Sequence, residues 1–320
     1  MADQSTELAR KIRKEAARLG FCAIGFSSPV PQPLAMQRYD SMIDEKRHGE
    51  MTYLEKGRDA RAMPSMLLVG IQTIISAAIS YNHPFQPDTE KPGISKYALV
   101  PDYHVILRQK LEELLTTLKT LTAEPFNAVI TVDSAPVLEK NWAEHAGIGK
   151  TGKNTLLMIP STGSYVFLGE IFIDLSITDQ RQPLPNLCGS CCSCLDSCPT
   201  GALDGPGKLD ASRCISYLTV ELKREFSAEE AAMIGTRLFG CDQCQEACPY
   251  NRQAIIRAHE SFPLRNNLIS ITADEILNLT GSGFRDLFYG TPVFRIGLRR
   301  LKRNARAVAE NLKKAETEHK

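Results

Sequence analysis

The stretch CGSCCSCLDSCP, Cys188 to Pro199, decides the fold together with CDQCQEACP, Cys241 to Pro249. Nine of the ten cysteines lie between Cys188 and Cys248. The first stretch has the spacing C-x2-C-x2-C-x3-C-P of bacterial ferredoxins, in which three cysteines of a tight loop bind one 4Fe-4S cluster and the fourth binds the other cluster. The second stretch lacks the first cysteine of this run. Cys214 can supply that ligand if residues 215–240, which have helical character, fold out as an insertion.

Because the fourth cysteine of each run binds the cluster of the other run, the eight thiolates divide into two sets of four. The first predicted set is Cys188, Cys191, Cys194 and Cys248. The second predicted set is Cys198, Cys214, Cys241 and Cys244. Cys22 and Cys192 stay outside both sets and are predicted to be structural. Two zinc sites are the alternative, because sets of four cysteines also bind zinc, but this spacing closed by proline favours iron-sulfur clusters. Two neighbouring clusters indicate a path for electrons.

The bulk properties are those of a globular protein. The chain has 320 residues, 43% of them hydrophobic, a length that predicts two or three units. Its net charge is +1, so binding of a polyanion would need a local cationic patch. Residues 1–10 are polar and unlike a secretory signal, so we expect a cytoplasmic location, where thiolate ligands are favoured over disulfides. The longest apolar run, Met66 to Ser80, is shorter than the roughly 20 residues of a membrane-spanning helix.

Helices and strands alternate over residues 1–175, which predicts an α/β (α+β) domain with a mixed sheet. The uncharged run 71–81 is typical of a central strand that is buried on both faces. The apolar residues of 102–121 follow one face of a helix, and Asp102 is its expected N-cap. A strand predicted over 126–132 ends at Asp133. The other predicted elements are helices 5–19 and 137–146 and strands 21–26, 155–159 and 165–173.

Two further units complete the predicted organisation. Residues 176–258 form a ferredoxin-like domain for two clusters, with the insertion 215–240, and residues 259–320 form a short helical C-terminus. The sequence RIGLRRLKRNAR, residues 295–306, predicts a helix with one basic face. Its cationic residues are Arg295, Arg299, Arg300, Lys302, Arg303 and Arg306. Such a face is typical of a nucleic-acid contact, and a merely solvated helix face is the alternative.

Several separate stretches resemble the epoxyqueuosine reductases, which are cobalamin-dependent iron-sulfur enzymes of tRNA modification. Besides the cysteine run they are SKYALVPDYH (Ser95 to His104), VDSAPVLEK (Val132 to Lys140), AGIGKTGKNTLL (Ala146 to Leu157), GSYVFLGEI (Gly163 to Ile171), RCISYLT (Arg213 to Thr219) and FGCDQCQEACPYN (Phe239 to Asn251). The resemblance covers about residues 5–305. It is specific because many motifs stand in the order that the family has.

The resemblance implies two 4Fe-4S clusters and a cobalamin, the latter held in a nitroreductase-like domain formed by residues 1–175. Reduced cobalt, supplied with electrons by the clusters, would attack the epoxide of epoxyqueuosine at the wobble position of a tRNA anticodon. Asp133 matches the acid that protonates the opening oxygen before loss of water leaves queuosine. The end of a strand suits a catalytic side chain, and burial beside the corrin would raise its pKa. The structural alternative is that Asp133 caps the helix that follows.

The resemblance also implies contacts for each partner. The residues carried over as cobalamin contacts, besides Asp133, are Arg58, Tyr97, Lys153, Asn154, Ser164, Tyr165 and Ser216. The basic helix would bind the tRNA anticodon stem-loop, and an external donor such as a flavodoxin or ferredoxin system would supply electrons. We expect a monomer without membrane contact, whose C-terminus is a truncated beginning of HEAT-like repeats. No D-x-H-x-x-G motif offers a histidine ligand to cobalt, so His83, His104 and His145 are predicted to be ordinary polar residues.

Two other functions fit part of the sequence. One is a cobalamin-dependent reductase of a small molecule, similar to the reductive dehalogenases, which the basic helix and the lack of an export leader disfavour. The other is a non-enzymatic ferredoxin-type electron carrier, which the α/β domain of some 175 residues disfavours. Within the first function, the insertion begins with a segment expected to close over the corrin. The cluster that uses Cys214 is therefore predicted to lie nearer the cobalt.

Overall fold

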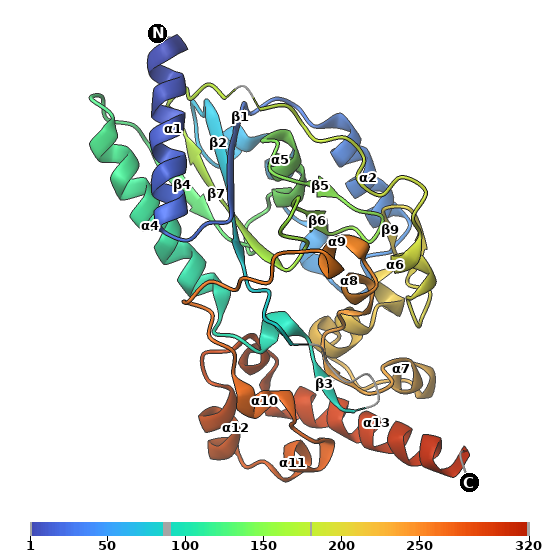
Figure 1. The fold of residues 1–320 in the computed structure, drawn as a ribbon. Helices are drawn as coiled ribbons and strands as arrows, with labels where there is room; N and C mark the ends of the chain where they lie inside the picture. Colours follow the sequence, from blue (N-terminus) through green and yellow to red (C-terminus); the bar gives the residue numbers. More distant parts are fainter. Residues whose placement is uncertain (1, 86–90, 180, 319–320) are drawn as a thin grey trace.

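A four-stranded sheet forms the centre of the N-terminal half, and helices cover both of its faces (Figure 1). The computed structural model describes residues 2–85, 91–179 and 181–318. The strand order is β1-β2-β7-β4, and every neighbouring pair is antiparallel. The bounds are β1 Ala23–Ser27, β2 Thr73–Ser80, β7 Val166–Ile173 and β4 Ala128–Thr131.

The α/β class is confirmed, but this sheet is antiparallel rather than mixed. All eight residues of β2 are buried, as they would be in a parallel sheet. Here the burial comes from helices on both faces, so an uncharged strand does not reveal the direction of its neighbours. Among the described residues, the parallel pair lies outside this sheet and joins β3 (Gly93–Ile94) to β10 (Arg237–Phe239).

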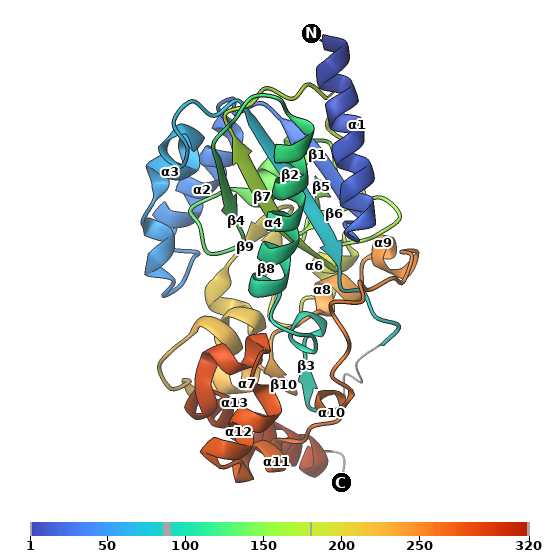
Figure 2. The same ribbon diagram turned by 90° about the vertical axis from the view of Figure 1, so that its left-hand side faces the viewer.

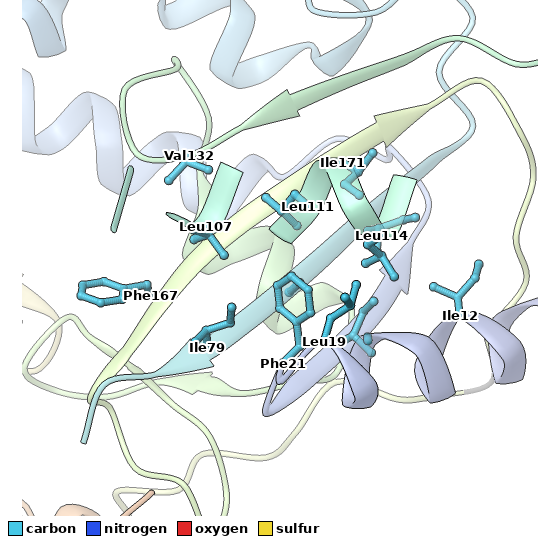
Figure 3. Close-up of a cluster of buried hydrophobic side chains, with 14 of the residues drawn as sticks. Ile12, Leu19, Phe21, Ile79, Leu107, Leu111, Leu114, Val132, Phe167 and Ile171 are labelled. Atoms are coloured by element: carbon cyan, nitrogen blue, oxygen red, sulfur yellow. The ribbon is translucent and has the colours of Figure 1, made fainter. Parts of the chain in front are cut away.

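Helices α1 (Ala2–Arg18) and α4 (Tyr103–Leu121) pack together on one face of the sheet. Figure 3 shows apolar side chains of both helices meeting those of β2 and β7, among them Ile12, Leu111 and Ile171. Gly169 of β7 allows the close approach of α4, because a Cβ there would lie 2.7 Å from Leu111 Cδ1. The expected N-cap is confirmed, since Asp102 accepts a hydrogen bond from the His104 N–H at 3.1 Å. Replacing a leucine as buried as Leu111 by alanine typically costs about 2–5 kcal/mol.

The opposite face of the sheet carries α5 (Glu139–His145), which packs on β2 and β7. Trp142 of α5 is buried with Ile74 and Phe172 in a small core. A short antiparallel pair, β5 and β6, follows α5, and the strand predicted over 155–159 shrinks to two residues. The remaining elements of this half are α2 Pro33–Asp44, η1 Thr52–Glu55, α3 Arg58–Ala62, η2 Pro64–Met66, η3 Lys96–Ala98, β5 Lys150–Thr151 and β6 Leu157–Met158.

The cysteine-rich segment is built of short elements. These are α6 Ser193–Asp196, β8 Leu203–Gly205, β9 Lys208–Leu209, η4 Ala211–Arg213, α8 Gln243–Glu246 and α9 Pro249–Arg252. The insertion 215–240 is only partly helical, contrary to expectation. It contains the π-helical turn η5 (Tyr217–Glu221) and α7 (Ala228–Met233), and it ends in strand β10. A strand forms there because the backbone of β10 pairs with β3, a partner distant in the sequence.

The C-terminal helices form a second hydrophobic core with the insertion (Figure 2). Leu218 and Phe239 of the insertion lie in this core with Phe288 and Leu301. Tyr97 packs against both this core and the core of the sheet. None of the helices among the described residues has the length and apolar character needed to cross a membrane. The C-terminal elements are α10 Asn266–Ile269, α11 Ala273–Asn278, α12 Gly281–Phe288, η6 Pro292–Ile296 and α13 Gly297–Glu318.

Candidate active site and cluster segment

The thiols of the cysteine-rich segment fall into two neighbourhoods. Burial raises the pKa of Cys194, and the nearby Cys188 and Cys248 raise it further. Burial also raises the pKa of Cys248, with Cys188 and Cys191 as its thiol neighbours. These contacts join the cysteines that the ferredoxin spacing assigns to the first cluster. Positive iron can replace the protons that burial favours on these thiols.

The second neighbourhood contains the other predicted set. Cys214 has Cys198 as its thiol neighbour, and Cys241 has Cys214, while burial raises the pKa of Cys241 to about 12. Burial raises the pKa of Cys244 too, and its neighbours are Cys241, Cys214 and Cys194. Cys194 of the first set thus raises the pKa of Cys244 in the second, so the two sets are neighbours. The ligand assignment itself stays a prediction, which this arrangement supports.

The two cysteines outside these sets have protein partners of their own. Cys22 Sγ lies 3.2 Å from the Ala78 carbonyl oxygen, and burial raises its pKa to about 12. Cys192 Sγ lies 3.5 Å from Lys153 Nζ. A thiol with a high pKa is a poor nucleophile, which is consistent with a structural role for Cys22.

Asp133 stands directly after β4 and has a positive φ of 55°. Its Oδ2 accepts hydrogen bonds from the Tyr103 hydroxyl at 2.7 Å and from His104 Nε2 at 3.1 Å. The side chain is nevertheless 56% exposed, so its carboxylate remains accessible from outside. The alternative that Asp133 caps α5 is wrong, because the N-cap of α5 is Leu138.

The pKa of Asp133 is shifted in the direction opposite to the sequence-based expectation. The hydrogen bond from His104 lowers it most, the Tyr103 hydroxyl and the charge of Arg295 add to this, and together they outweigh burial. Burial alone would lower the pKa of His104, but hydrogen bonds to Asp102 (2.7 Å) and Asp133 raise it. The two groups therefore hold a proton preferentially on the imidazole. Arg295 Nη1 lies 2.6 Å from His104 Nε2 at the edge of this group.

His104 is the site residue that the sequence analysis missed. It was predicted to be an ordinary polar residue, whereas it contacts the candidate acid. The available signal was its place in the first turn of a helix whose N-cap is Asp102. A histidine beside such a carboxylate is a common proton carrier, but its contact with Asp133 depends on tertiary packing.

Two glutamates, Glu139 and Glu170, lie behind Asp133. Glu139 Oε1 accepts a hydrogen bond from the Asp133 backbone N–H at 2.6 Å. Glu170, in the middle of β7, is fully buried, and its Oε2 lies 3.4 Å from Thr131 Oγ1. Burial raises the pKa of both glutamates; the nearby Glu139 raises that of Glu170 further, and the negative charge of Asp133 raises that of Glu139.

Several predicted cobalamin contacts lie where the sheet domain meets the cysteine-rich segment. Asn154 Nδ2 lies 3.4 Å from the Cys244 carbonyl oxygen. Ser164 Oγ donates to Gln245 Oε1 at 3.0 Å and accepts from Asn251 Nδ2 at 2.9 Å. Ser164 is therefore engaged by the protein itself. Next to it, Tyr165 is buried and its hydroxyl has no hydrogen-bond partner among the described residues.

The other predicted contacts are scattered. Lys153 Nζ lies near Cys192 Sγ, and Tyr97 is partly buried between the two cores. Ser216 is the N-cap of the π-helical turn η5. Arg58 lies elsewhere, because it forms two hydrogen bonds of 2.8 and 2.7 Å with Asp40. This pair lines an open cavity of about 560 Å³ between α2 and α3.

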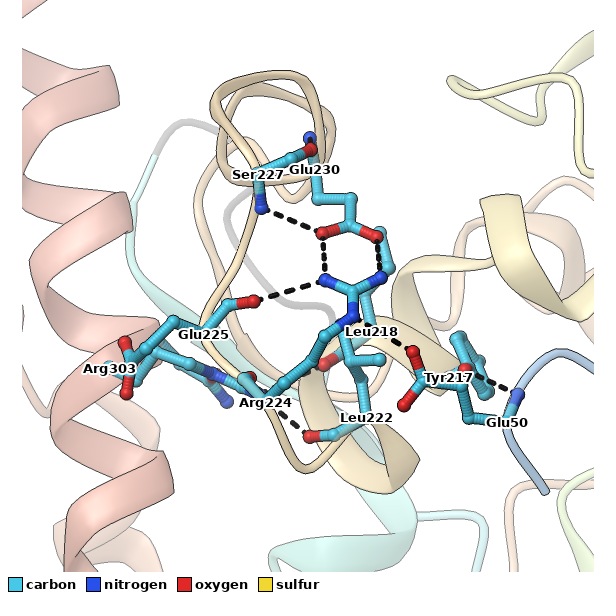
Figure 4. Close-up of polar contacts among 10 residues, drawn as sticks. Glu50, Tyr217, Leu218, Leu222, Arg224, Glu225, Ser227, Glu230 and Arg303 are labelled. Carbon is cyan, nitrogen blue, oxygen red and sulfur yellow. Dashed lines mark hydrogen bonds and ion pairs between the residues drawn. The ribbon is translucent and has the colours of Figure 1, made fainter. Parts of the chain in front are cut away.

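The basic face expected over 295–306 is only partly present. Arg303 is buried, and it donates to the carbonyl oxygens of Leu218 at 3.0 Å and Leu222 at 2.8 Å (Figure 4). Arg300 donates to the Val220 carbonyl oxygen at 3.0 Å. Neither side chain belongs to an open basic face, because each caps carbonyl groups of the insertion. The outward stripe consists of the exposed Arg295 at the end of η6, the exposed Arg299 and Arg306 of α13, and the half-buried Lys302.

Comparison with known proteins assigns the family. A family model described as "Epoxyqueuosine reductase QueG, DUF1730" matches residues 61–134, and a 4Fe-4S double cluster binding domain matches residues 187–251. The epoxyqueuosine reductase of Pseudomonas aeruginosa is 38% identical over 308 residues, which cover 93% of this chain and 83% of that protein. The enzyme of Escherichia coli is 36% identical over 308 residues, covering 93% of this chain and 79% of that protein.

Solved structures agree with these relatives. An epoxyqueuosine reductase crystallised with an epoxyqueuosine-modified tRNA stem loop superposes with a TM-score of 0.87 at 29% identity, covering 98% of this chain and 83% of that one. The epoxyqueuosine reductase from Streptococcus thermophilus gives a TM-score of 0.83 at 31% identity, covering 95% of this chain and 81% of that one. With such identity over more than nine-tenths of its length, the chain belongs to the epoxyqueuosine reductases, a family of cobalamin- and iron-sulfur-dependent oxidoreductases.

Proposed function

We propose that this protein reduces epoxyqueuosine to queuosine in tRNA, with Asp133 and His104 as its proton source. The observation that carries the proposal is the half-exposed Asp133 carboxylate, held by Tyr103 and His104 at the end of β4. Family membership supplies the reaction class, and this group supplies the acid that the reaction needs. Neither a small-molecule dehalogenase nor a simple electron carrier is favoured by these relatives.

The residues present fit a cobalamin beside the cysteine-rich segment. The buried hydroxyl of Tyr165 lacks a partner among the described residues, and an amide of a bound corrin can satisfy it. Lys153, Asn154 and Ser216 would border the same cofactor. When bound, cobalamin supplies the reduced metal centre that opens the epoxide, and the protein supplies position and protons. Arg58 is a weaker candidate because its guanidinium is already paired with Asp40.

The number of protons that the reaction consumes explains why Asp133 and His104 act together. Removal of the epoxide oxygen as water consumes two electrons and two protons. The lowered pKa of Asp133 and the raised pKa of His104 favour a pair in which the imidazole carries the shared proton. His104 can pass that proton across 3.1 Å to Asp133, which delivers it to the substrate oxygen, and the second proton can reach the exposed Asp133 carboxylate from solvent. Tyr103 keeps the carboxylate oriented, because burial raises the pKa of its hydroxyl and preserves it as a donor.

A second observation supports a working role for this aspartate. One solved epoxyqueuosine reductase, from Bacillus subtilis, is described with the loop of its catalytic aspartate swung out of the active site. Asp133 likewise lies on a connection, residues 132–138, between β4 and α5. We call these residues the Asp133 loop. A loop held by a few hydrogen bonds can present or withdraw its carboxylate.

The same proposal covers the partners. The relative solved with a modified stem loop supports tRNA as substrate, and the outward cationic stripe of α13 suits its phosphates. An external flavodoxin or ferredoxin system would feed the clusters, and the protein would act as a cytoplasmic monomer. The cluster on Cys198, Cys214, Cys241 and Cys244 would be the nearer to the cobalt, because Asn154 bonds the Cys244 carbonyl.

Substitution of Asp133 by asparagine tests the acid. We expect Asp133→Asn to retain iron, sulfide and cobalamin contents but to lose at least about a hundredfold in turnover of an epoxyqueuosine-bearing stem-loop, as removal of a general acid does. Single-turnover assays with chemically reduced protein measure the step directly. The exposed Asp274→Asn on α11 is the matched control and should keep full activity. Wild-type turnover by Asp133→Asn would remove the assignment.

A further inference from the structure

Two glutamates, the half-buried Glu139 and the fully buried Glu170, lie directly behind the Asp133 loop. Glu170 belongs to the middle strand β7, where its register partners are Ser76 on β2 and Thr131 on β4. It is fully buried, and among the described residues neither its Oε1 nor Ser76 Oγ has a hydrogen-bond partner. A carboxyl group buried at the centre of a sheet lowers the stability of the fold unless it is hydrogen-bonded or paired with another group.

The group it faces is Glu139 in the first turn of α5. The interaction between the two groups lowers the pKa of Glu139 and raises that of Glu170. Glu170 is the fully buried member of the pair, so a proton is favoured on Glu170 and Glu139 is left as the acceptor. Two carboxylates this close in a buried place cannot both be charged, so the pair retains one proton.

Glu139 in turn holds the backbone of Asp133. Its Oε1 accepts the Asp133 N–H at 2.6 Å, a charge-assisted bond when Glu139 is ionised. Asp133 needs such a restraint, because its φ of 55° is unfavourable for a residue other than glycine. The chain of contacts runs from Glu170 through Glu139 to the amide of the candidate acid.

The cations near Glu139 are bonded to other groups, so Glu139 can accept the Asp133 N–H. Burial and the negative charge of Asp133 raise the pKa of Glu139 to about 7. Lys140 sends its Nζ to the Thr155 carbonyl oxygen at 2.6 Å, so it offsets the charge of Glu139 only from a distance. Glu144, one turn further along α5, is engaged by Lys150 Nζ at 2.8 Å and the Thr151 N–H at 2.6 Å.

We propose that Glu139 is a positioning residue that holds the Asp133 loop in its working conformation, and that Glu170 is the buried proton carrier that keeps Glu139 available as an acceptor. The inference rests on the proposed role of Asp133. It adds a pH-dependent latch: protonation of Glu139 below neutral pH weakens its bond to the Asp133 amide and frees the loop.

Hydrogen-deuterium exchange of residues 132–138 in the protein carrying its clusters and cobalamin tests the latch without reference to activity. In wild type, protection of this segment, corrected for intrinsic exchange, should fall as the pH drops through about 7. Glu139→Gln should show fast exchange at every pH, at least about fivefold above wild type at pH 8, because a neutral amide oxygen is the weaker acceptor. Its turnover should fall while KM for the stem-loop stays unchanged.

Glu170→Gln should have the opposite effect on the pH profile. A glutamine amide donates permanently to Glu139 and cannot lose a proton, so Glu139 remains ionised to lower pH and protection persists below pH 7. Glu144→Gln, on the same helix but bonded to Thr151, is the matched control and should leave the Asp133 segment unchanged. If Glu139→Gln does not fold, the Glu170→Gln profile still decides.

Exchange of residues 132–138 that is independent of pH in wild type and unchanged in both variants would overturn the latch. That outcome differs from failure of the proposed function. Full turnover by Asp133→Asn would remove the acid assignment, whereas the exchange data would still report whether Glu139 holds the loop.

Discussion

A single proton shared by Asp133 and His104 connects the chemistry of this site to pH. The hydrogen bond between them lowers the pKa of the carboxyl and raises that of the imidazole. The bond needs an ionised carboxylate. It therefore stabilises the folded state at pH values above the pKa that Asp133 has in the unfolded chain. It is lost as the pH rises through the folded pKa of His104, because the imidazole must be charged.

Removal of the imidazole therefore has an effect on stability that depends on pH. We expect His104→Gln to lower the free energy of unfolding by roughly 1.5–3 kcal/mol near pH 6, the range for a hydrogen bond to a charged group. The loss should shrink as the pH rises through the folded pKa of His104, because wild type then loses the imidazolium. Thermal unfolding of both proteins between pH 6 and 9 measures the difference. A loss of equal size throughout would mean that the histidine acts by packing alone.

Some of these side chains could be assigned from the sequence and others could not. Asp133 follows an apolar strand, and that position is visible in the chain. The partners of Asp133 come from the start of α4, and Glu170 from the middle of β7, and their approach depends on how the sheet is ordered. A local pattern contains no strand order. The sequence therefore predicts the acid but not its surroundings.

At the scale of elements, the buried arginine side chain of α13 binds the insertion and is not exposed to solvent. Arg303 donates to carbonyls of Leu218, Leu222 and Arg224, and its guanidinium lies 4.0 Å from the centre of the Phe226 ring. Arg224 in turn forms a bidentate pair of 2.7 Å bonds with Glu230 and reaches Glu50 (Figure 4). A π-helical turn leaves carbonyls without intrahelical partners, and one buried cation satisfies several of them.

Removal of that cation should destabilise the insertion. Arg303→Met keeps much of the side-chain volume but leaves several buried carbonyls unpaired, so we expect a loss of about 3 kcal/mol or more. The outward Arg306→Ala on the same helix is the control and should change stability by less than about 0.5 kcal/mol. Thermal unfolding followed with the cluster absorbance compares them. Equal stability of the two variants would contradict the capping role.

The elements differ in how far the sequence predicts them. The uncharged β2 and the periodic α4, with its Asp102 cap, follow from local patterns. The two-residue strands and the pairing of β3 with β10 do not, because their stabilisation comes from distant backbone partners. Charge spacing made all of 295–306 look outward-facing. It could not show that Arg303 would find carbonyl groups of a segment some 80 positions earlier.

At the scale of the whole molecule, two hydrophobic cores meet at Tyr97. The Asp102 N–H donates to the Gly290 carbonyl oxygen at 2.8 Å, which joins the start of α4 to the segment before η6. The acid group thus lies where the C-terminal unit touches the sheet domain. The outward cations of α13 begin at the same place.

This arrangement predicts how RNA affinity depends on single cations. Arg299→Ala should weaken binding of the stem-loop several-fold and reduce the slope of log affinity against log salt by about 1, because one phosphate contact is lost. Lys313→Ala, exposed near the far end of α13, is the matched control and should change neither quantity. Fluorescence titrations at several salt concentrations supply both numbers. An unchanged slope for Arg299→Ala would place the RNA on another surface.

The contact of Arg295 with His104 has a consequence for the energetics of docking. The charge of Arg295 lowers the pKa of both Asp133 and His104. An RNA phosphate held by Arg295 offsets that charge, so both groups bind protons more tightly in the complex. Association and proton uptake then become linked equilibria: the complex draws protons from the buffer, and affinity falls as pH rises. Binding of the substrate therefore favours the protonated form of the Asp133 and His104 pair.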